Sequence, residues 1–426
     1  MSEITDFYQQ QVHQHETSEA LSWVSALQND ALLDFKRAGF PTRSDEEWKY
    51  TSVDAFLKQR FVNASNAEKA HDINHEIMPP IPCFQIKLIN GVITGIEAFE
   101  SSLPTGVVVL PLAQALVLHA EKIKPKLGHI LRHQHGFQAL NTAMLQCGLF
   151  IYLPADVHLS EPLWVSHWQD EPQQATYIRH LIIAEAGSSA SIIEDYQGDA
   201  LTAYLTNTMT EAYTAADAKV THYKILRESQ SAYHIGHLTV DQALKSQFDS
   251  HLFSFGGQLV RSDTTFNLQE PQARCVMNGV YAPAQGQHMD HHTVVNHNVP
   301  DCISSQDYKG ILSGQSRAVF NGKVVVAKDA QHTEAKQQNK NLLLSKNAEI
   351  DTKPQLEIFA NDVICTHGAT VGQLDEEALF YLATRGIEHT EATQYLIQAF
   401  AAENLRAVPN AKLAAWLSGL LNEQIG

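Results

Sequence analysis

Two short runs of the sequence combine residue types that bind transition metals. In the first, His288, Asp290 and His292 alternate with other residues. Successive side chains of a β-strand point to opposite faces, so these three would share one face. Two imidazoles and a carboxylate are suitable ligands for zinc or iron. Polar residues on a solvent-facing strand or at a subunit interface would give the same spacing, so a metal site here is a hypothesis.

The second run spans residues 362–368, in which Cys365 and His367 are two positions apart. On a strand, a thiolate and an imidazole would again share a face, and this pair suits iron or zinc. Two ligands do not complete a tetrahedral site, so others would have to come from another segment or another chain. The alternatives are a thiol that packs as a small apolar side chain and a hydrogen-bonded histidine at an interface.

The sequence lacks the common motifs of nucleotide-dependent and hydrolytic enzymes. It contains no GxxxxGK[ST] phosphate loop, no GxGxxG turn, no GxSxG elbow and no HExxH zinc pair. Its five cysteines are scattered without a CxxC pair, which disfavours a disulfide framework or a zinc knuckle. Any ATP hydrolysis that the function requires is therefore expected from another protein.

The chain is acidic, with a formal net charge of -17 from 47 acidic and 30 basic residues. Such a surface repels phosphate groups, so we expect neither nucleic acid nor an anionic membrane as a partner. The N-terminal residues lack the basic start and apolar run of a signal peptide. The most apolar stretch, residues 106–120, is too short and too polar to span a bilayer. Together these features predict a cytoplasmic protein.

The elements that would position the candidate residues form a repeating β structure. A small or polar turn precedes a strand at Ala190, Ala218, Lys245 and Ala273, which are almost evenly spaced along the chain. Strands that recur at this period of roughly 28 residues, without crossover helices, indicate a β-solenoid whose coils stack to bury their apolar faces. The alternative is a β-sandwich, but its turns recur about every 8–12 residues.

Helical segments are expected at both ends of this β structure. Apolar residues recur at helical spacing from Leu21 to Phe35, and Trp48 and Tyr50 are expected to anchor the N-terminal region on the rest. Near the C-terminus, Asp375 is expected to cap one helix and Thr390 a second. The apolar residues of these last helices, including Phe380, are expected to pack within the helical unit.

The predicted organisation has three parts. Residues 1–82 form an N-terminal helical region with a linker. Residues 83–370 form a β-helix core, interrupted by a helix over about 112–123 that lies between Pro111 and Pro125. Residues 371–426 form a C-terminal helical domain.

A long segment near the C-terminus resembles a known family. Within residues 308–387, SRAVFNGKVVV, QQNKNLLLS, DTKPQLEIFANDV, THGATVG and LFYLATRGI occur in that order. Together with FPTRSDEEWKYT at residues 40–51, these sequences resemble the shared signature of the SufB/SufD family of iron–sulfur cluster assembly proteins. Two features resemble the SufD branch. THGATVG stands where SufB carries an EHEAT-type sequence, and Ala348 occupies the position of a cluster-related SufB cysteine.

The resemblance implies a right-handed parallel β-helix between α-helical N-terminal and C-terminal domains, in agreement with the repeat. It also implies a non-catalytic scaffold subunit that pairs with a SufB-like subunit and binds a SufC-like ATPase through its C-terminal helices. His367 matches a histidine implicated beside the SufB cysteine at the interface where the nascent iron–sulfur cluster forms, whereas a role for Cys365 stays open. The lone chain is expected to hold no stable cofactor and could form a homodimer.

Two other functions are compatible with a β-solenoid. Some polysaccharide lyases and hydrolases have this fold and use paired carboxylates or a metal in a groove, which would make the chain a metal-dependent enzyme. A free-standing metal-binding protein would use the cluster of His288, Asp290 and His292. The THGATVG and LFYLATRG sequences favour the assembly function over the enzyme, and metal analysis of the purified chain would test the metal-binding function.

Overall fold

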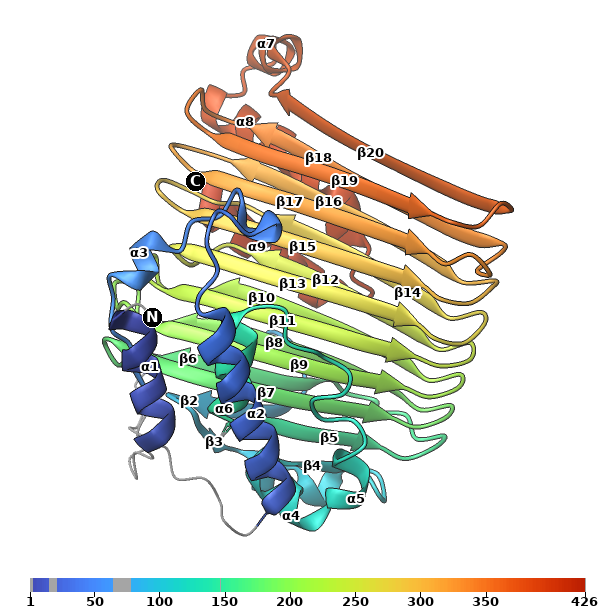
Figure 1. The fold of residues 1–426 in the computed structure, drawn as a ribbon. Helices are drawn as coiled ribbons and strands as arrows, with labels where there is room; N and C mark the ends of the chain where they lie inside the picture. Colours follow the sequence, from blue (N-terminus) through green and yellow to red (C-terminus); the bar gives the residue numbers. More distant parts are fainter. Residues whose placement is uncertain (1–2, 15–20, 64–77, 146, 426) are drawn as a thin grey trace.

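The computed structural model describes residues 3–14, 21–63, 78–145 and 147–425. The described residues form a β-solenoid of two stacked sheets, with helices from the N-terminal and C-terminal parts of the chain packed on its outer faces (Figure 1), which confirms the predicted fold class. From β5 (Leu149–Leu153) onward, consecutive strands of the chain alternate between the two sheets, so each coil adds one strand to each sheet. The repeat found in the sequence is therefore a pair of strands rather than one.

Each sheet is built from strands that are separated by one coil in the sequence. The first sheet contains β19 (Glu349–Ile358), β17 (Arg317–Val326), β15 (His288–His297), β13 (Leu259–Leu268), β11 (Tyr233–Gln242), β9 (Leu205–Thr214), β7 (Gln174–Ala184), β5 and β4 (Val108–Pro111), with β1 (Val62–Asn63) beside β7. The second sheet contains β20 (Val363–Gln373), β18 (Thr333–Leu343), β16 (Ile303–Leu312), β14 (Arg274–Tyr281), β12 (Gln247–Ser254), β10 (Lys219–Arg227), β8 (Ser189–Gly198), β6 (Leu163–Gln169), β2 (Phe84–Ile89) and β3 (Val92–Thr94). Neighbouring strands are parallel except at the N-terminal end of the solenoid, where β2 pairs with β3 and β4 with β5 in antiparallel fashion.

The strand register gives the length of each coil. Lys219 of β10 lies opposite Gln247 of β12, which is one predicted period along the chain. Ala190 of β8, however, lies opposite Val220 and not Ala218, so this coil is two residues longer than predicted. The turn after β8, residues 199–204, is longer than the turn after β10, residues 228–232. Turns lie outside the stacked strands, so their lengths vary without disturbing the ladder.

Inward-facing side chains form the core of the solenoid because alternate residues of each strand point into it. Ala190, Val220, Phe248 and Cys275 lie opposite one another in four successive strands of the second sheet, and all are buried in one cluster. A single coil could not shield such residues from water, whereas each additional coil covers the one before it. The last coil has no further coil beyond it, so its inward-facing side chains are not covered on that side.

The N-terminal helices cover the outer face of the first sheet (Figure 1). They are α1 (Glu3–Gln14), α2 (Ser22–Ala38), α3 (Asp54–Leu57) and α6 (Gly136–Ala143). Trp48 is 2% exposed and packs in this layer, which confirms that it anchors the region. The predicted helix over 112–123 is split at His119 into α4 (Leu112–Leu118) and α5 (Ala120–Ile123). Helix α6 was not predicted: it has only 8 residues, and all of them are buried, including its polar residues Gln138, Asn141 and Thr142.

The C-terminal helices cover the outer face of the second sheet. They are α7 (Glu376–Thr384), α8 (His389–Arg406) and α9 (Ala411–Ile425). The predicted cap is confirmed for α7, where the Asp375 carboxylate accepts hydrogen bonds from the next turn. It is wrong for Thr390, because α8 already begins at His389. Phe380 was expected to pack inside but is 72% exposed. Within the described part of the chain, no helix is long and apolar enough to cross a membrane.

Candidate functional site

The C-terminal end of the solenoid is open. Strands β19 and β20 are the terminal members of their sheets, and among the described residues each pairs with a neighbour on one side only (Figure 1). The outer edge of each strand therefore presents backbone donors and acceptors to solvent, which is the surface that another strand recognises. We refer to β19, β20 and their inward-facing side chains as the open end.

Cys365 and His367 lie on the inward face of the open end. In the pairing of β20 with β18 they are opposite Ala335 and Gln337, both of which are buried inside the solenoid. The predicted shared face is therefore confirmed. His367 is exposed because no further coil covers it, whereas Cys365 is half-buried and burial raises the pKa of its thiol. Cys365 is thus a protonated thiol at neutral pH, and His367 is the more accessible ligand.

The layer directly beneath His367 is polar. Gln337 donates from Nε2 to Oε1 of Gln306 at 3.2 Å, and Asn339 donates from Nδ2 to the Tyr281 hydroxyl at 3.0 Å. Asn341 donates from Nδ2 to Oδ1 of Asn339 at 2.6 Å. These buried amides hold one another in fixed orientations. A group bound at His367 would therefore rest on a rigid, hydrogen-bonding floor.

Exposed apolar side chains lie near this polar floor at the open end. Ile358 and Val371 are exposed, although the residues opposite them in the preceding coil, Val326 and Asn341, are buried. Phe359, which follows β19, and Ile364, on the outer face of β20, are exposed as well. A cluster of exposed large apolar residues beside unpaired strand edges is typical of a surface that a partner covers.

The other predicted group, His288, Asp290 and His292, lies on the outer face of β15 beneath residues 47–51. The Thr51 hydroxyl lies 2.9 Å from Nε2 of His288 and donates to Asp290. His292 contacts Asp290 through Nε2 at 3.0 Å and Glu47 through Nδ1 at 3.3 Å. The segment that carries part of the family signature is therefore held to the solenoid by these three residues.

Asp290 is also paired with Arg261 of the neighbouring strand. Arg261 donates from Nη1 to Asp290 and from Nε to Asp263, each at 2.6 Å, and its guanidinium lies 4.5 Å from the centre of the Trp48 ring. Burial opposes ionisation of Asp290, but Arg261 and His292 outweigh it and hold the pKa of Asp290 well below its ordinary value. A metal role for His288, Asp290 and His292 stays a prediction, and the ion pairs show how this carboxylate is satisfied without one.

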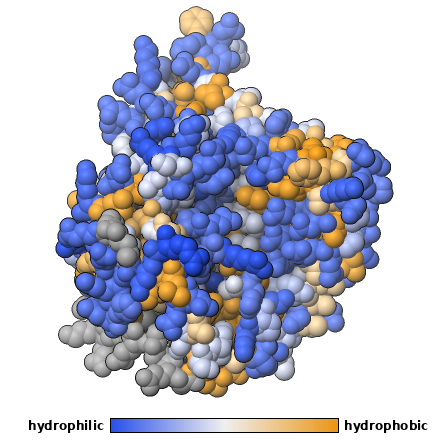
Figure 2. Space-filling model, in the orientation of Figure 1, coloured by the Kyte–Doolittle hydropathy of each residue, from blue (hydrophilic) through white to orange (hydrophobic). Residues whose placement is uncertain are grey.

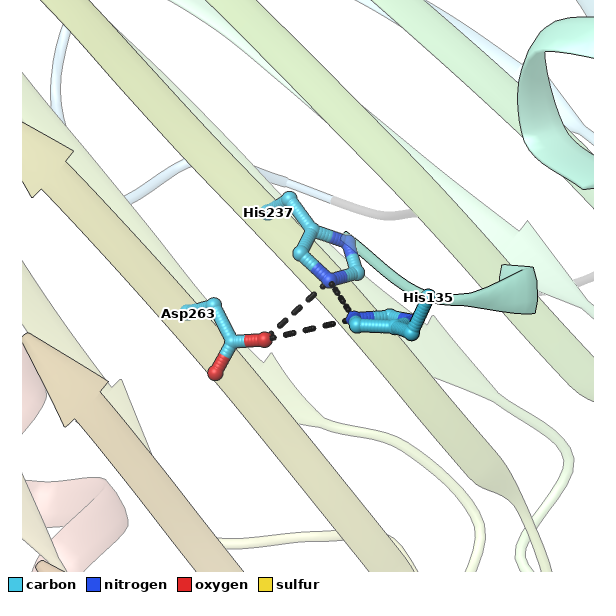
Figure 3. Close-up of side chains that lie close together, drawn as sticks. All are labelled: His135, His237 and Asp263. Carbon is cyan, nitrogen blue, oxygen red and sulfur yellow. Dashed lines mark hydrogen bonds and ion pairs between the residues drawn. The ribbon is translucent and has the colours of Figure 1, made fainter. Parts of the chain in front are cut away.

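Two other groups bring three potential metal ligands together within the described ranges. His135, His237 and Asp263 meet outside the solenoid, beneath the N-terminal region (Figure 3). Residue spacing did not reveal this group, because His135 is far from the other two along the chain. The signal that could have found part of it is the strand register, which places His237 opposite Asp263.

The second group, His167, His180 and Glu194, is buried inside the solenoid. Nδ1 of His180 accepts a hydrogen bond from the backbone N–H of Leu149 at 3.0 Å, so Nε2 carries the proton and has no lone pair for a metal. Glu194 already accepts hydrogen bonds from Tyr196 and Thr210 and contacts His222. This group is an internal polar layer whose carboxylate is fully engaged.

Most of the chain matches models of known protein families. Residues 1–165 match the model of the SufBD protein N-terminal region, and residues 167–400 match the SufBD core domain of SUF system iron–sulfur cluster assembly. The chain is 32% identical over 389 residues to the iron–sulfur cluster assembly protein SufD of Escherichia coli (strain K12), covering 88% of this chain and 87% of that protein. It is 29% identical over 436 residues to a SufBD family protein of Synechocystis, covering 96% of each chain. It is 27% identical over 386 residues to the chloroplastic protein ABCI7 of Arabidopsis thaliana, covering 88% of this chain and 80% of that protein. The chain therefore belongs to the SufB/SufD family of iron–sulfur cluster assembly proteins.

Proposed function

We propose that this chain is a scaffold subunit, without catalytic activity of its own, of a complex that assembles iron–sulfur clusters. Family membership supports the process, and the position of His367 supports the role. An imidazole at the open end, beside unpaired strand edges and above a polar floor, is placed where a second chain would complete a site. The cluster is the product of this site rather than a resident cofactor.

The partner at the open end is a SufB-like subunit whose own solenoid continues the two sheets. Backbone hydrogen bonds to β19 and β20 would supply affinity, and the exposed apolar residues would supply contact area. Such pairing would bury His367 next to ligands of the partner. A borderline-soft imidazole can then bind iron or hold a sulfur-bearing intermediate by a hydrogen bond.

A SufC-like ATPase supplies the energy and binds the C-terminal helices. The chain has no phosphate loop of its own. Phe380 and Tyr381 of α7 and Tyr395 of α8 are exposed aromatic side chains, which are enriched at protein interfaces. These side chains lie on the helices that follow β20 and not on the inward face of the open end, so we expect both partners to bind together.

Co-expression with SufB-like and SufC-like proteins from the same organism tests the proposal. We expect one complex that contains all three proteins, together with iron and acid-labile sulfide after reconstitution, whereas the lone chain hydrolyses no ATP. A chain that purifies alone despite soluble partners would contradict the scaffold role. ATP turnover by the pure lone chain would contradict its non-catalytic character.

A further inference from the structure

We propose that His135, His237 and Asp263 bind one divalent transition metal ion between the N-terminal region and the solenoid (Figure 3). His135 lies directly before α6, His237 lies on β11 and Asp263 on β13. The site is outside the solenoid and is built without residues of the open end. It does not rest on the proposed role in cluster assembly.

The three ligand atoms have the spacing of a metal site. Nε2 of His135 and Nε2 of His237 are 3.1 Å apart. Oδ2 of Asp263 lies 3.2 Å from Nε2 of His237 and 3.7 Å from Nε2 of His135. A triangle with these sides has a centre about 2.0 Å from each corner, which is the length of a zinc–nitrogen or zinc–oxygen bond. An ion could therefore contact all three atoms without movement of the side chains.

A cation also satisfies these atoms better than protons do. If His237 donates from Nε2 to Asp263, it has no lone pair on that atom for His135. If His135 instead donates to His237, Asp263 Oδ2 loses its donor. One proton therefore leaves at least one of these close contacts without a hydrogen bond, whereas a metal ion accepts a lone pair from each atom.

Arg261 orients the Asp263 carboxylate for metal binding and leaves one of its oxygens free. It donates from Nε to Oδ1 of Asp263 at 2.6 Å, which fixes the carboxylate and leaves Oδ2 facing the two imidazoles. Such outer contacts orient the ligands of metal sites. The charge of Arg261 is also shared with Asp290. Asp263 therefore keeps negative charge available for a cation.

Surface hollows reach the site from two sides. Gln138, His237 and Asp263 line one hollow, and Trp48, His135 and Asp263 line the other. The first has a volume of about 350 Å³, whereas a water molecule occupies about 30 Å³. A water can therefore complete the coordination. Two imidazoles and one carboxylate with an open position are a ligand set for zinc(II) or for non-haem iron(II).

Metal titration of the full-length chain tests the proposal. The protein should carry no histidine tag and should first be stripped with a chelator. Zinc(II) alone, and iron(II) alone under anaerobic conditions, are then titrated by equilibrium dialysis, with cobalt(II) as a spectroscopic probe of the coordination geometry. We expect one ion per chain, and the two arms identify the preferred metal. His135→Gln and His237→Gln should each weaken binding by at least about 100-fold, because outer-shell changes alone cost 10–100-fold.

His129→Gln is the matched control, because His129 is an exposed histidine on the rim of the same hollow. It should bind the metal as the unchanged chain does. Thermal unfolding in chelator shows whether each variant folds, and metal should raise the midpoint of the unchanged chain but not of His135→Gln. The proposal is overturned if folded, stripped protein binds no ion, or if both substitutions leave the affinity unchanged.

Discussion

His367 lies directly opposite Gln337 in the last strand pair of the solenoid, yet Gln337 is 2% exposed and His367 is open to solvent. The difference arises only from position, because Gln337 has a further strand beside it and His367 does not. An added strand would bury His367 as β20 buries Gln337. The inward-facing side chains of the open end are therefore arranged like those of an interior coil, except that no further strand covers them.

Replacement of His367 by alanine should abolish cluster formation without unfolding the chain. The side chain is exposed in the lone protein, so its loss should change the free energy of unfolding by about 0.5 kcal/mol or less. Iron and acid-labile sulfide in the reconstituted complex are the measurements. Thr366→Ala is the control, because Thr366 is exposed on the opposite face of the same strand. Normal cluster content in His367→Ala would show that the imidazole has no role in assembly.

A charge on the inward face of the open end should prevent pairing with the SufB-like subunit. Val371 shares the face of His367 and is 51% exposed, so Val371→Glu should fold normally but place an unpaired carboxylate in the interface. A charge left buried and unpaired in an interface costs about 2–5 kcal/mol of binding free energy, which corresponds to a loss of affinity of about 30-fold or more. Analytical ultracentrifugation measures it. Leu201→Glu, in an exposed turn far from this end, should bind like the unchanged chain.

Substitution of two exposed phenylalanines should distinguish the surfaces that bind the two partners. Phe380 lies on α7 and Phe359 follows β19 at the open end. We expect Phe380→Ala to weaken binding of the SufC-like ATPase by at least about 1 kcal/mol while leaving the SufB-like subunit bound, because exposed aromatic anchors dominate interfaces. Phe359→Ala should have the reverse effect. Pull-down of each partner separately measures both. Equal loss of both partners in each variant would indicate misfolding or a shared surface.

Buried His297 should make the fold sensitive to acid. Burial lowers the pKa of His297 to about 4, below the value of about 6.5 for an unfolded histidine. Between these values the unfolded chain binds the extra proton, so stability is complete above about pH 6.5 and falls as the pH is lowered toward 4. Between pH 7 and pH 5, the free energy of unfolding should therefore fall by about 2 kcal/mol less in His297→Gln than in the unchanged chain. Urea unfolding at both pH values measures this.

Exposed His158 provides the control for this pH effect. His158→Gln removes a histidine whose side chain is exposed in the folded chain, so the same measurement on it shows how much of the change is specific to the buried ring. A pH dependence that is the same in His297→Gln as in the unchanged chain would contradict the role of His297.

Local periodicity was sufficient for the features that depend on neighbouring residues. The alternation along one strand placed Cys365 and His367 on one face, and the even spacing of the turns indicated the solenoid. The repeat was less accurate at Ala190, where the coil is two residues longer, because turn length is not constrained by the ladder. Phe380 was misjudged for another reason. An apolar residue on a helix can be covered by a partner as well as by the chain itself.

Contacts between distant segments were not accessible from spacing. The approach of His135 to His237 depends on how α6 lies on the first sheet, and no local pattern encodes that distance. The ion pair of Arg261 with Asp290 needed the register of β13 against β15, which places them directly opposite each other. The residues of both groups are present in the sequence, but only the stacking of the coils shows which of them lie close together.

The two ends of the solenoid differ, and this difference limits the stoichiometry of any assembly that forms through strands. At the N-terminal end the sheets finish in the short antiparallel strands β3 and β4, and α4 packs against β4. Among the described strands, only β19 and β20 offer long parallel edges. Head-to-tail addition would need a second such edge, so chains cannot polymerise into a fibre by this route. Two solenoids that join at their open ends leave no free site for a third, and the product is a closed pair.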